Sequence, residues 1–431
     1  MKRVLIITYY WPPAGGPGVQ RWLKFVKYFR EFGVEPIVYI PENPNYPLMD
    51  DNLQSEIPSG IEIVKYPIKE PYGIANVFSK KKTKQMSSGI ISKKELSFLE
   101  KLMLYVRGNF FIPDARIGWV KPSVKFLSEY ISNKPVDVIV TTGPPHSLHL
   151  IGMQLKYDLD IKWIADFRDP WTTIHYHKSL RLNKASERKH KQLEASVLKK
   201  ADVITVTSPT TKKEFEIITK QPIYVITNGF DYEKVSGITM DKAFSISHIG
   251  SLLSGRNPEI LWRILKDISE ENPSFKKSLQ LKFVGAVSEE VKKSLQENHL
   301  LEVAEFKPYV SHSEALKLQQ QTQILLLVEI NSPETRAIIP GKLFEYLAAQ
   351  RPIVALGPEG SDIKSIIDET KAGTFFNYKN EALLKSKLLE HFKDFQEGNL
   401  NISSQGLDKY SRLELTSQMA SIINSISSLK K

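Results

Sequence analysis

The sequence predicts an α/β protein made of two Rossmann-like, doubly wound domains that face each other across a cleft. Its 431 residues exceed the roughly 250 to 300 that one hydrophobic core organises. In both halves a short apolar, β-branched run and a Gly or Pro turn precede a longer amphipathic stretch. The turn Asn228-Gly229 separates the two series, so we expect domains at residues 1–228 and 229–407. Parallel strands end at a common edge, where such sheets bind ligands.

In the first half, strands and helices alternate except across one long interval. Residues 67–120 fit the alternation poorly and contain a bulky stretch around Phe110, Phe111, Ile112 and Trp119. We expect an insertion with its own helices there, and the alternative is that these side chains pack against the first sheet. The predicted strands are 4–8, 35–40, 61–66, 136–141, 162–165 and 203–206, and the predicted helices are 19–32, 122–131, 146–158, 183–201 and 210–219.

The second half repeats the pattern with shorter turns. Each apolar run is followed by a helical pattern, as parallel strand–helix–strand units require. The predicted strands are 244–249, 279–284, 304–306, 324–328, 353–355 and 373–376.

Composition excludes several classes of protein. The chain is 41% hydrophobic and 25% charged, which excludes wholesale disorder and a polytopic membrane protein. It has no cysteine, so disulfides and thiolate metal sites are excluded, and a reducing cytoplasm suits it. No run of 18 apolar residues is present.

The net charge of +11 lies entirely in the first half. Residues 1–228 hold 34 Lys and Arg against 22 Asp and Glu, whereas residues 229–431 hold 25 against 26. The densest basic segments are 80–84 and 181–200. A basic face attracts anionic partners such as lipid headgroups or nucleic acid, and the alternative is a solvated surface. An apolar patch beside lysines is also typical of a membrane-surface contact.

A glycine-rich loop follows the first strand. It reads Pro12-Pro13-Ala14-Gly15-Gly16-Pro17-Gly18 and leads into a helix that carries Arg21. Glycines let backbone N–H groups approach an anion or a sugar, and the helix N-terminus favours negative charge. The spacing G-G-x-G differs from the dinucleotide fingerprint G-x-G-x-x-G, and this argues against a nicotinamide site at this loop.

Two further loops of the first half carry titratable groups. Thr142-Gly143-Pro144-Pro145-His146 places an imidazole just after a strand, where it can hydrogen-bond to a substrate hydroxyl or phosphate. The next strand ends in Asp166-Phe167-Arg168-Asp169, which either fixes the loop as a charge network or binds substrate. Asp169 orients the His146 ring if the two strands are neighbours.

The second half carries two loops suited to a diphosphate. His248-Ile249-Gly250-Ser251 leads to Arg256, whose guanidinium can grip phosphate in bidentate fashion. Farther on, Gly341 and Lys342 stand at a helix start, with Glu345 about one turn later on an otherwise apolar helix. A carboxylate there can accept both ribose hydroxyls while the helix N-terminus holds the diphosphate.

These motifs together resemble the family-4 glycosyltransferases. Those are retaining enzymes of the GT-B architecture, which transfer sugar from a nucleotide diphosphate to an acceptor. The resemblance spans nearly the whole chain and is most specific in Pro340-Gly341-Lys342-Leu343-Phe344-Glu345-Tyr346 with Arg351-Pro352. The family's E-x7-E pair is incomplete, because Ala337 stands eight residues before Glu345, and Glu329 or Glu334 is the alternative first carboxylate.

The resemblance implies the roles of the domains and residues. Residues 1–228 would bind the acceptor, 229–407 the nucleotide-sugar, and 408–431 would form a helix crossing back to the first domain. The predicted catalytic residues are His146, Arg256 and Lys342; the predicted donor-binding residues are Gly16, Gly18, Gly250, Arg256, Gly341, Lys342 and Glu345; and the predicted acceptor-binding residues are Arg21 and Asp169.

The resemblance thus implies a retaining glycosyltransferase, which we expect to be cytoplasmic and to need no metal or other cofactor. Its partners would be a nucleotide diphosphate sugar and a glycan or lipid-linked acceptor in cell-surface polysaccharide synthesis, with peripheral contact to the inner face of an anionic membrane. Nucleic acid is not expected, because the basic residues are not interleaved with a recognisable module. The alternatives are a nucleotide-sugar 2-epimerase of the same architecture and a degenerate transferase that acts as a binding scaffold.

Overall fold

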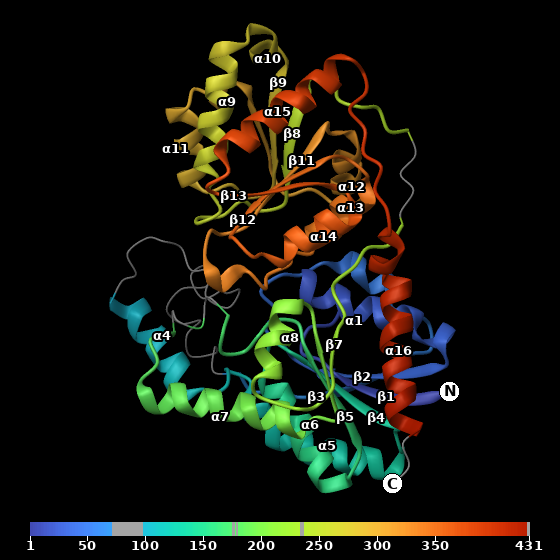
Figure 1. Ribbon diagram of the computed structural model, residues 1–431. Coiled ribbons are helices and arrows are strands. Elements are labelled where there is room, and N and C mark those ends of the chain that lie inside the picture. The colour runs from blue at the N-terminus through green and yellow to red at the C-terminus, as the bar shows by residue number, and fades with distance from the viewer. Residues whose placement is uncertain (71–97, 175–176, 178–179, 233–236, 429–431) are drawn as a thin grey trace. The chain divides into compact units, whose positions relative to one another are not determined.

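The computed structural model describes residues 1–70, 98–174, 177, 180–232 and 237–428 (Figure 1). The chain divides into two compact units: unit 1 comprises residues 1–228 and 412–431, and unit 2 comprises residues 229–411. The boundary after Asn228 falls where the sequence places it. The lysine run 80–84 lies outside the described residues. The cleft that the sequence predicts between the two domains stays a prediction.

Unit 1 is built on a seven-stranded parallel sheet. The strand order is β3-β2-β1-β4-β5-β6-β7. Six of these strands match predicted ones, and the seventh, at the edge, was missed because three residues with Tyr224 exposed form too short an apolar run. The strands are β1 Lys2–Ile7, β2 Val34–Pro41, β3 Glu62–Tyr66, β4 Val138–Gly143, β5 Lys162–Phe167, β6 Val203–Val206 and β7 Ile223–Val225.

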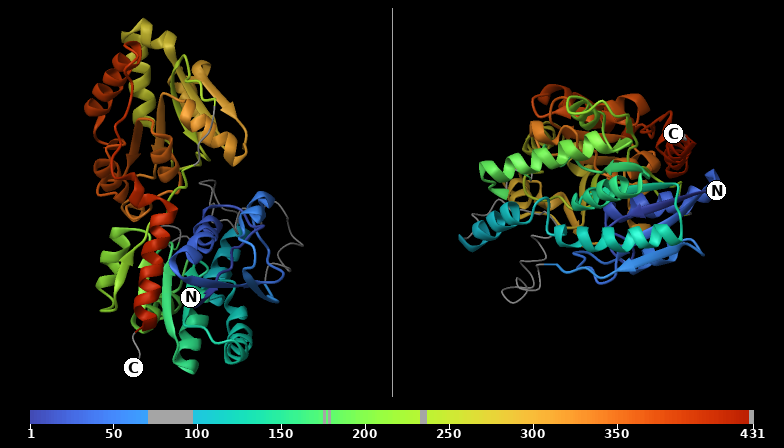
Figure 2. Two further views of the ribbon diagram at one scale, coloured as in Figure 1. Left: turned by 90° about the vertical axis from the view of Figure 1, so that its right-hand side faces the viewer. Right: turned by 90° about the horizontal axis from the view of Figure 1, so that it is seen from below.

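Helices cover both faces of this sheet (Figures 1 and 2). Along β1 the side chains alternate, so Val4 and Ile6 pack with α1 and α16 while Leu5 and Ile7 pack with α5 and α6. The C-terminal helix α16 packs against α1 within unit 1. The helices are α1 Pro17–Tyr28, α4 Phe98–Phe110, α5 Ile117–Asn133, α6 Ser147–Leu159, α7 Lys184–Lys200, α8 Pro209–Glu216 and α16 Arg412–Ser428.

The interval 67–120 combines the two expected arrangements. Its described part contains α4 and the start of α5. Trp119 is buried and its ring stacks on Tyr39 of β2 at 5.0 Å, so this aromatic packs against the sheet. Phe110, at the end of α4, is 72% exposed and belongs to a helix of the insertion.

Unit 2 is built on a six-stranded parallel sheet in the order β10-β9-β8-β11-β12-β13. All six strands were predicted. Two core clusters fill its faces, with Ile246 of β8 in one and Ile249 in the other. The elements are β8 Phe244–Ile249, α9 Glu259–Glu271, α10 Pro273–Ser278, β9 Leu279–Val284, α11 Glu289–Glu297, β10 Ala304–Lys307, α12 His312–Gln321, β11 Ile324–Val328, α13 Lys342–Ala349, β12 Ile353–Gly357, α14 Asp362–Thr370, β13 Gly373–Asn377 and α15 Glu381–Gln396.

The predicted α/β class with two Rossmann-like domains is therefore confirmed. In the part of the chain that the structure describes, no helix combines the length and the apolar character needed to cross a bilayer.

Candidate functional site

In unit 2, the loop after β8 lies against the start of α13. Gly250 has φ +117°, and a Cβ at this position would lie 2.7 Å from Nζ of Lys342. Its N–H donates to the carbonyl of Val284 at the end of β9 (2.8 Å), which fixes the loop to the sheet. Only glycine satisfies both the left-handed backbone and the close approach of the lysine.

The half-buried Lys342 and the buried His248 form a pair beneath this loop. Lys342 Nζ lies 2.9 Å from His248 Nε2, and His248 Nδ1 lies 2.9 Å from the carbonyl of Leu326. An ammonium only donates, so Nε2 accepts and Nδ1–H donates to the carbonyl. The pKa of His248 lies well below its usual range. Burial is the larger cause, and the positive charge of Lys342 is the next. The pKa of Lys342 is lowered to about 8, mainly by burial and next by repulsion from the charge of Arg256.

Arg256 is paired with Glu329, which follows β11. Arg256 Nη2 lies 3.1 Å from Oε1 of Glu329 and 3.3 Å from Oε2. The carboxylate is fully buried and its Oε1 also accepts from the N–H of Ile330, whereas the Arg256 side chain is 28% exposed. Burial raises the pKa of Glu329 despite the attraction of Arg256. The guanidinium therefore has solvent-facing surface left for an anion.

Glu345 and Tyr346 lie on α13 just after Lys342. Glu345 is half-buried and its Oε2 accepts a hydrogen bond from the side-chain amide of Gln319 on α12 (3.0 Å). The hydroxyl of Tyr346 accepts from the N–H of Ile249 (2.9 Å), which ties the end of β8 to the helix. Gly341 is the N-cap residue and supplies no side-chain cap. The N–H groups of Leu343 and Phe344 donate to the carbonyls of Pro340 (3.0 Å) and Gly341 (3.1 Å), so the start of α13 favours an anion mainly through the helix dipole.

The predicted donor-binding residues of unit 2 therefore lie at one place. The charges of Arg256, Glu345 and Glu329 all act on Lys342. Two cations beside a glycine loop and a helix N-terminus suit a diphosphate, and the carboxylate one turn into the helix suits a pair of hydroxyls. Among the described residues, no group of three or more His, Asp or Glu side chains has a metal-binding arrangement.

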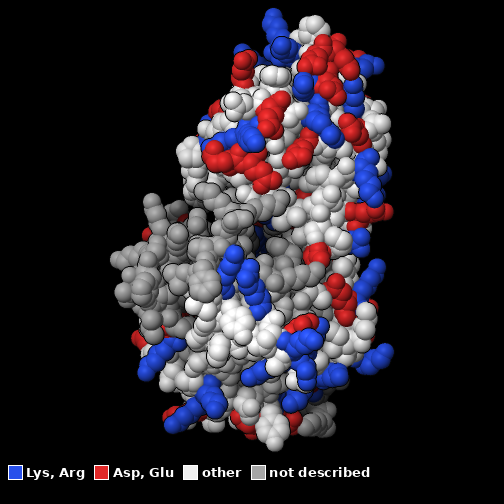
Figure 3. All heavy atoms as spheres, turned by 90° about the vertical axis from the view of Figure 1, so that its left-hand side faces the viewer, with Lys and Arg blue, Asp and Glu red and all other residues white. Residues whose placement is uncertain are grey.

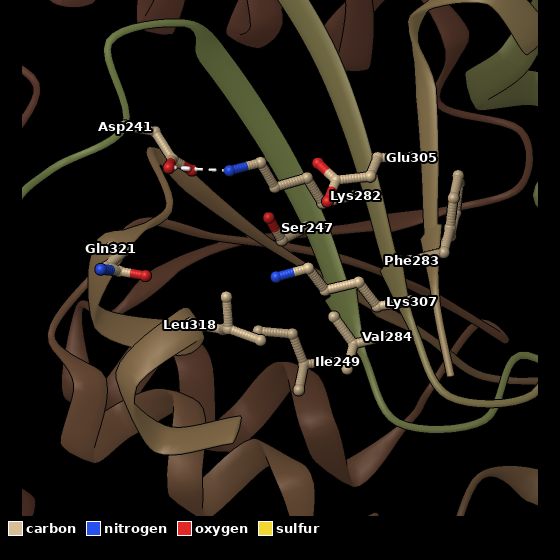
Figure 4. A pocket seen from close by; sticks show the side chains of 10 residues that line it. All are labelled: Asp241, Ser247, Ile249, Lys282, Phe283, Val284, Glu305, Lys307, Leu318 and Gln321. Carbon is tan, nitrogen blue, oxygen red and sulfur yellow. Dashed lines mark hydrogen bonds and ion pairs between the residues drawn. The ribbon is translucent and has the colours of Figure 1, made fainter. Parts of the chain in front are cut away.

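A separate small pocket opens on the same sheet beside α12 (Figure 4). Figure 4 shows Lys282 pointing at Asp241, and the distance from Lys282 Nζ to Asp241 Oδ1 is 2.7 Å. Glu305 and Lys307 also line it, so two acids face two lysines. Because these charges balance, a diphosphate suits the Arg256 and Lys342 cluster better than this pocket.

In unit 1, the carboxyl ends of the neighbouring strands β1, β4 and β5 bring the predicted loops together. Arg168, after β5, donates from Nη2 to the carbonyl of Pro144 in the turn after β4. A Cβ on Gly18 would lie 2.2 Å from Nη1 of the same guanidinium, and Gly16 has φ +96°. Arg168 thus bridges the glycine-rich loop and the Pro-Pro-His turn.

The structure corrects the predicted orientation of His146 by Asp169. The His146 ring stacks on Trp171 at 5.0 Å and 2°, and both of its nitrogens lack a hydrogen-bond partner in the described structure. The pKa of His146 lies well below its usual range, mainly because the ring is buried and next because the neighbouring His149 would repel a charge on it. Burial also raises the pKa of the half-buried Asp169. An aromatic stack, not a carboxylate, positions this imidazole.

The predicted acceptor contact of Arg21 is corrected as well. Arg21 Nη2 lies 2.8 Å from Oδ1 of Asp166, and the two side chains are 1% and 0% exposed. Its Nη1 donates to the carbonyl of Thr227 (2.8 Å). A side chain this buried offers no surface to an acceptor. Burial raises the pKa of Asp166, but Arg21 and three further donors more than offset this and leave it lowered.

Sequence reasoning placed Arg168 and His248 within predicted loops but gave neither of them a contact, and it did not pair Glu329 with Arg256. Only the fold shows what Arg168 and His248 contact. Glu329 was considered only as a replacement for a missing carboxylate. Its position directly after an apolar strand was the available signal.

Comparison with known proteins supports the resemblance. Residues 92–234 match the sequence model of Glycosyltransferase Family 4, so the resemblance is confirmed over that part of the chain. A protein of Bacillus subtilis strain 168 named as the teichuronic acid biosynthesis glycosyltransferase TuaH is 24% identical over 199 residues, which are 44% of this chain and 49% of that protein. The match thus spans about half the length of this curated relative.

Solved structures share the fold over the whole chain. Sucrose-phosphate synthase from Thermosynechococcus elongatus has a TM-score of 0.62 at 13% identity and covers 100% of both chains. WaaG, a glycosyltransferase involved in lipopolysaccharide biosynthesis, has a TM-score of 0.55 at 12% sequence identity, and the match covers 97% of this chain and 99% of WaaG. A Listeria monocytogenes protein named as a UDP-N-acetylglucosamine 2-epimerase has a TM-score of 0.55 at 12% sequence identity, and the match covers 100% of this chain and 98% of that protein. These likenesses confirm the GT-B type of fold.

Proposed function

We propose that this protein is a retaining glycosyltransferase that moves a sugar from a nucleotide diphosphate sugar to a glycan or lipid-linked acceptor during polysaccharide assembly. One observation carries the proposal: Lys342 lies against Gly250 in the loop after β8, and the same loop carries Arg256, at the carboxyl edge of the sheet, where doubly wound sheets bind ligands. The match to Glycosyltransferase Family 4 and the likeness to TuaH support the reaction class.

The charges of this cluster suit the departure of a nucleoside diphosphate. In the reaction, the bond from the sugar carbon to the diphosphate oxygen breaks, a bond to the acceptor oxygen forms, and the proton of the acceptor hydroxyl passes to the departing diphosphate or to water. Negative charge then grows on the diphosphate, where Arg256 and Lys342 stabilise it. A preorganised charged donor of this kind contributes roughly 3 kcal/mol, near a hundredfold in rate.

The remaining residues hold the donor and acceptor. Glu345 accepts hydrogen bonds from the ribose hydroxyls, and the positive end of the α13 dipole stabilises the diphosphate. His146 is the proposed contact of a sugar hydroxyl, because both of its ring nitrogens are buried without a hydrogen-bond partner among the described residues and a hydroxyl that reaches them would supply one. Asp169, with its half-buried carboxyl, remains the proposed acceptor contact of unit 1. An acceptor on a lipid carrier would place the protein at the surface of an anionic membrane.

A thermal-shift experiment with UDP-, GDP- and ADP-sugars tests the donor site. A ligand at 100 times its Kd stabilises the folded protein by about 2.7 kcal/mol. We expect Glu345→Ala to abolish the shift and Arg256→Ala to weaken it strongly. Arg256→Ala is also made with Glu329→Gln, so that no buried carboxylate is left without its cation.

The exposed pair Arg263 and Glu381 supplies matched controls in the same unit. Arg263→Ala and Glu381→Ala should leave the shift at its wild-type size. Unchanged shifts in both site variants would overturn the assignment. Turnover of UDP-N-acetylglucosamine without any acceptor would indicate a 2-epimerase instead, and donor binding without hydrolysis or transfer would indicate a binding scaffold.

A further inference from the structure

Helix α4 packs with one face and leaves the opposite face in solvent. Leu104 is 3% exposed, and a Cβ on Gly108 would lie 2.8 Å from the carbonyl oxygen of Leu180. Residues three and four apart share a helix face. The opposite face is an apolar stripe of four side chains that are between 38% and 72% exposed, namely Leu102, Tyr105, Val106 and Phe110.

Such a stripe is unusual within this protein. No other helix of the described chain carries more than two exposed large apolar side chains. Soluble proteins scatter such residues singly, whereas a contiguous patch marks an interaction surface. The stripe therefore needs an apolar partner.

The surroundings of the stripe are basic. Helix α4 contains two basic residues, Lys101 and Arg107, against one acidic residue, Glu100. The end of α4 is tied to the start of α7, because Asn183 N–H donates to the side-chain oxygen of Asn109 (2.9 Å). On the face that Figure 3 shows, basic side chains gather over unit 1 and both signs mix over unit 2. Segment 181–191 exposes Arg181, Lys184, Arg188, Lys189 and Lys191 against one acid, Glu187.

We propose that this α4–α7 surface, the apolar stripe with the exposed basic side chains of 181–191, docks on a bilayer of anionic lipids. The stripe enters the boundary between headgroups and acyl chains while the basic side chains meet the lipid phosphates. A second copy of the chain fits less well, because a two-fold contact would bring the same positive charges together. The inference deepens the proposed function, on whose membrane location it rests, and it names the surface that makes the contact. Docking itself requires neither donor nor turnover.

Co-sedimentation of the full chain with lipid vesicles tests the surface. We expect binding to vesicles that contain phosphatidylglycerol and little binding to pure phosphatidylcholine. Binding to the anionic vesicles should weaken at high salt, because the Debye length falls from about 8 Å at 0.15 M to about 3 Å at 1 M. Equal binding to both kinds of vesicle, or to neither, would overturn the proposal.

Paired variants separate the two parts of the surface. Val106→Ser with Phe110→Ser should lower binding about tenfold through lost apolar burial. Its control is Tyr157→Ser with Ile217→Ser, which alters side chains 82% and 87% exposed elsewhere in unit 1.

Lys184→Gln with Arg188→Gln should lower binding about 25-fold, since each basic residue near an anionic surface contributes about fivefold. Its control is Lys276→Gln with Lys277→Gln, which removes the same charge from exposed positions in unit 2. Loss of binding in the controls equal to that in the site variants would contradict a specific surface.

Two further measurements keep the outcomes distinct. The thermal shift by nucleotide-sugar should keep its wild-type size in all four double variants. The vesicle result and the donor-site result thus succeed or fail independently. A dimer in sedimentation velocity that the Val106→Ser, Phe110→Ser variant dissociates would assign the stripe to a second copy and overturn the lipid proposal.

Discussion

The carboxyl edges of the two sheets use charge in opposite ways. In unit 1, Asp166 and Arg21 are buried together and the carboxylate accepts from several donors of the same unit. In unit 2, Arg256 keeps 28% of its side chain exposed and lies close enough to Lys342 to lower its pKa. The first arrangement holds a domain together, and the second has positive charge left for a ligand. Burial separates these two roles, although the residue types are the same.

Replacement of Asp166 is the most severe test of this comparison. Asp166→Asn leaves Arg21 buried without its anion, and breaking a buried pair costs about 3 to 5 kcal/mol. Denaturant unfolding followed by tryptophan fluorescence measures this, because five of the six tryptophans lie in unit 1.

The control for Asp166 is its neighbour Asp169. Burial raises the pKa of Asp169, so Asp169→Asn removes a charge that the fold disfavours. Its free energy of unfolding should change by less than about 1 kcal/mol. Equal losses in the two variants would contradict the buried role assigned to Asp166.

The pH dependence of diphosphate binding sharpens the comparison. Lys342 carries its charge below its pKa of about 8, so the affinity for UDP should fall as the pH rises above 8, by up to about tenfold at pH 9. Unit 1 should contribute nothing in this range, because the buried His149, with a pKa of about 3, stays neutral. Calorimetric titration between pH 7 and 9 measures the effect.

Lys342→Arg is the matching variant for the pH experiment. A guanidinium keeps its charge throughout this range, so the variant should show a flat profile whatever its affinity at pH 7. An unchanged pH profile in Lys342→Arg would assign the titration to another group.

The smallest expected effect comes from the glycine beside Lys342. Gly250→Ala strains a backbone at φ +117° and pushes a methyl group against the ammonium, so UDP affinity should fall severalfold. Gly406→Ala, at φ +62° with no atom within 4 Å of the new methyl group, should cost about 1 kcal/mol of stability and leave UDP affinity unchanged. Equal affinities in the two variants would argue against the contact.

Much of the fold followed from the sequence because its signals are local. Strands 244–249, 279–284 and 324–328 match the structure residue for residue, since each is a short apolar run bounded by turn residues. Strand β4 runs two residues beyond its predicted end, because its pairing with β5 continues to Gly143. Here a neighbouring strand, not the local sequence, decides where the strand ends.

The site was predictable to the level of its loops. Gly250, Arg256, Lys342 and Glu345 follow strands or begin a helix, and parallel strands bring such positions to one edge. The partners were not predictable, because Glu329 lies 73 residues from Arg256 and His248 lies 94 from Lys342. Pairings of this length leave no periodic trace in the chain.

By itself, the sequence determined two parallel α/β units, their boundary after Asn228 and the loops that meet at each sheet edge. These follow from hydrophobic periodicity and turn residues, which act over a few neighbours. Only the tertiary structure decided that Arg21 is buried while Arg256 is partly exposed, and that Trp171 stacks on His146. Burial and ion pairing depend on which distant segments pack together, and that information is not local.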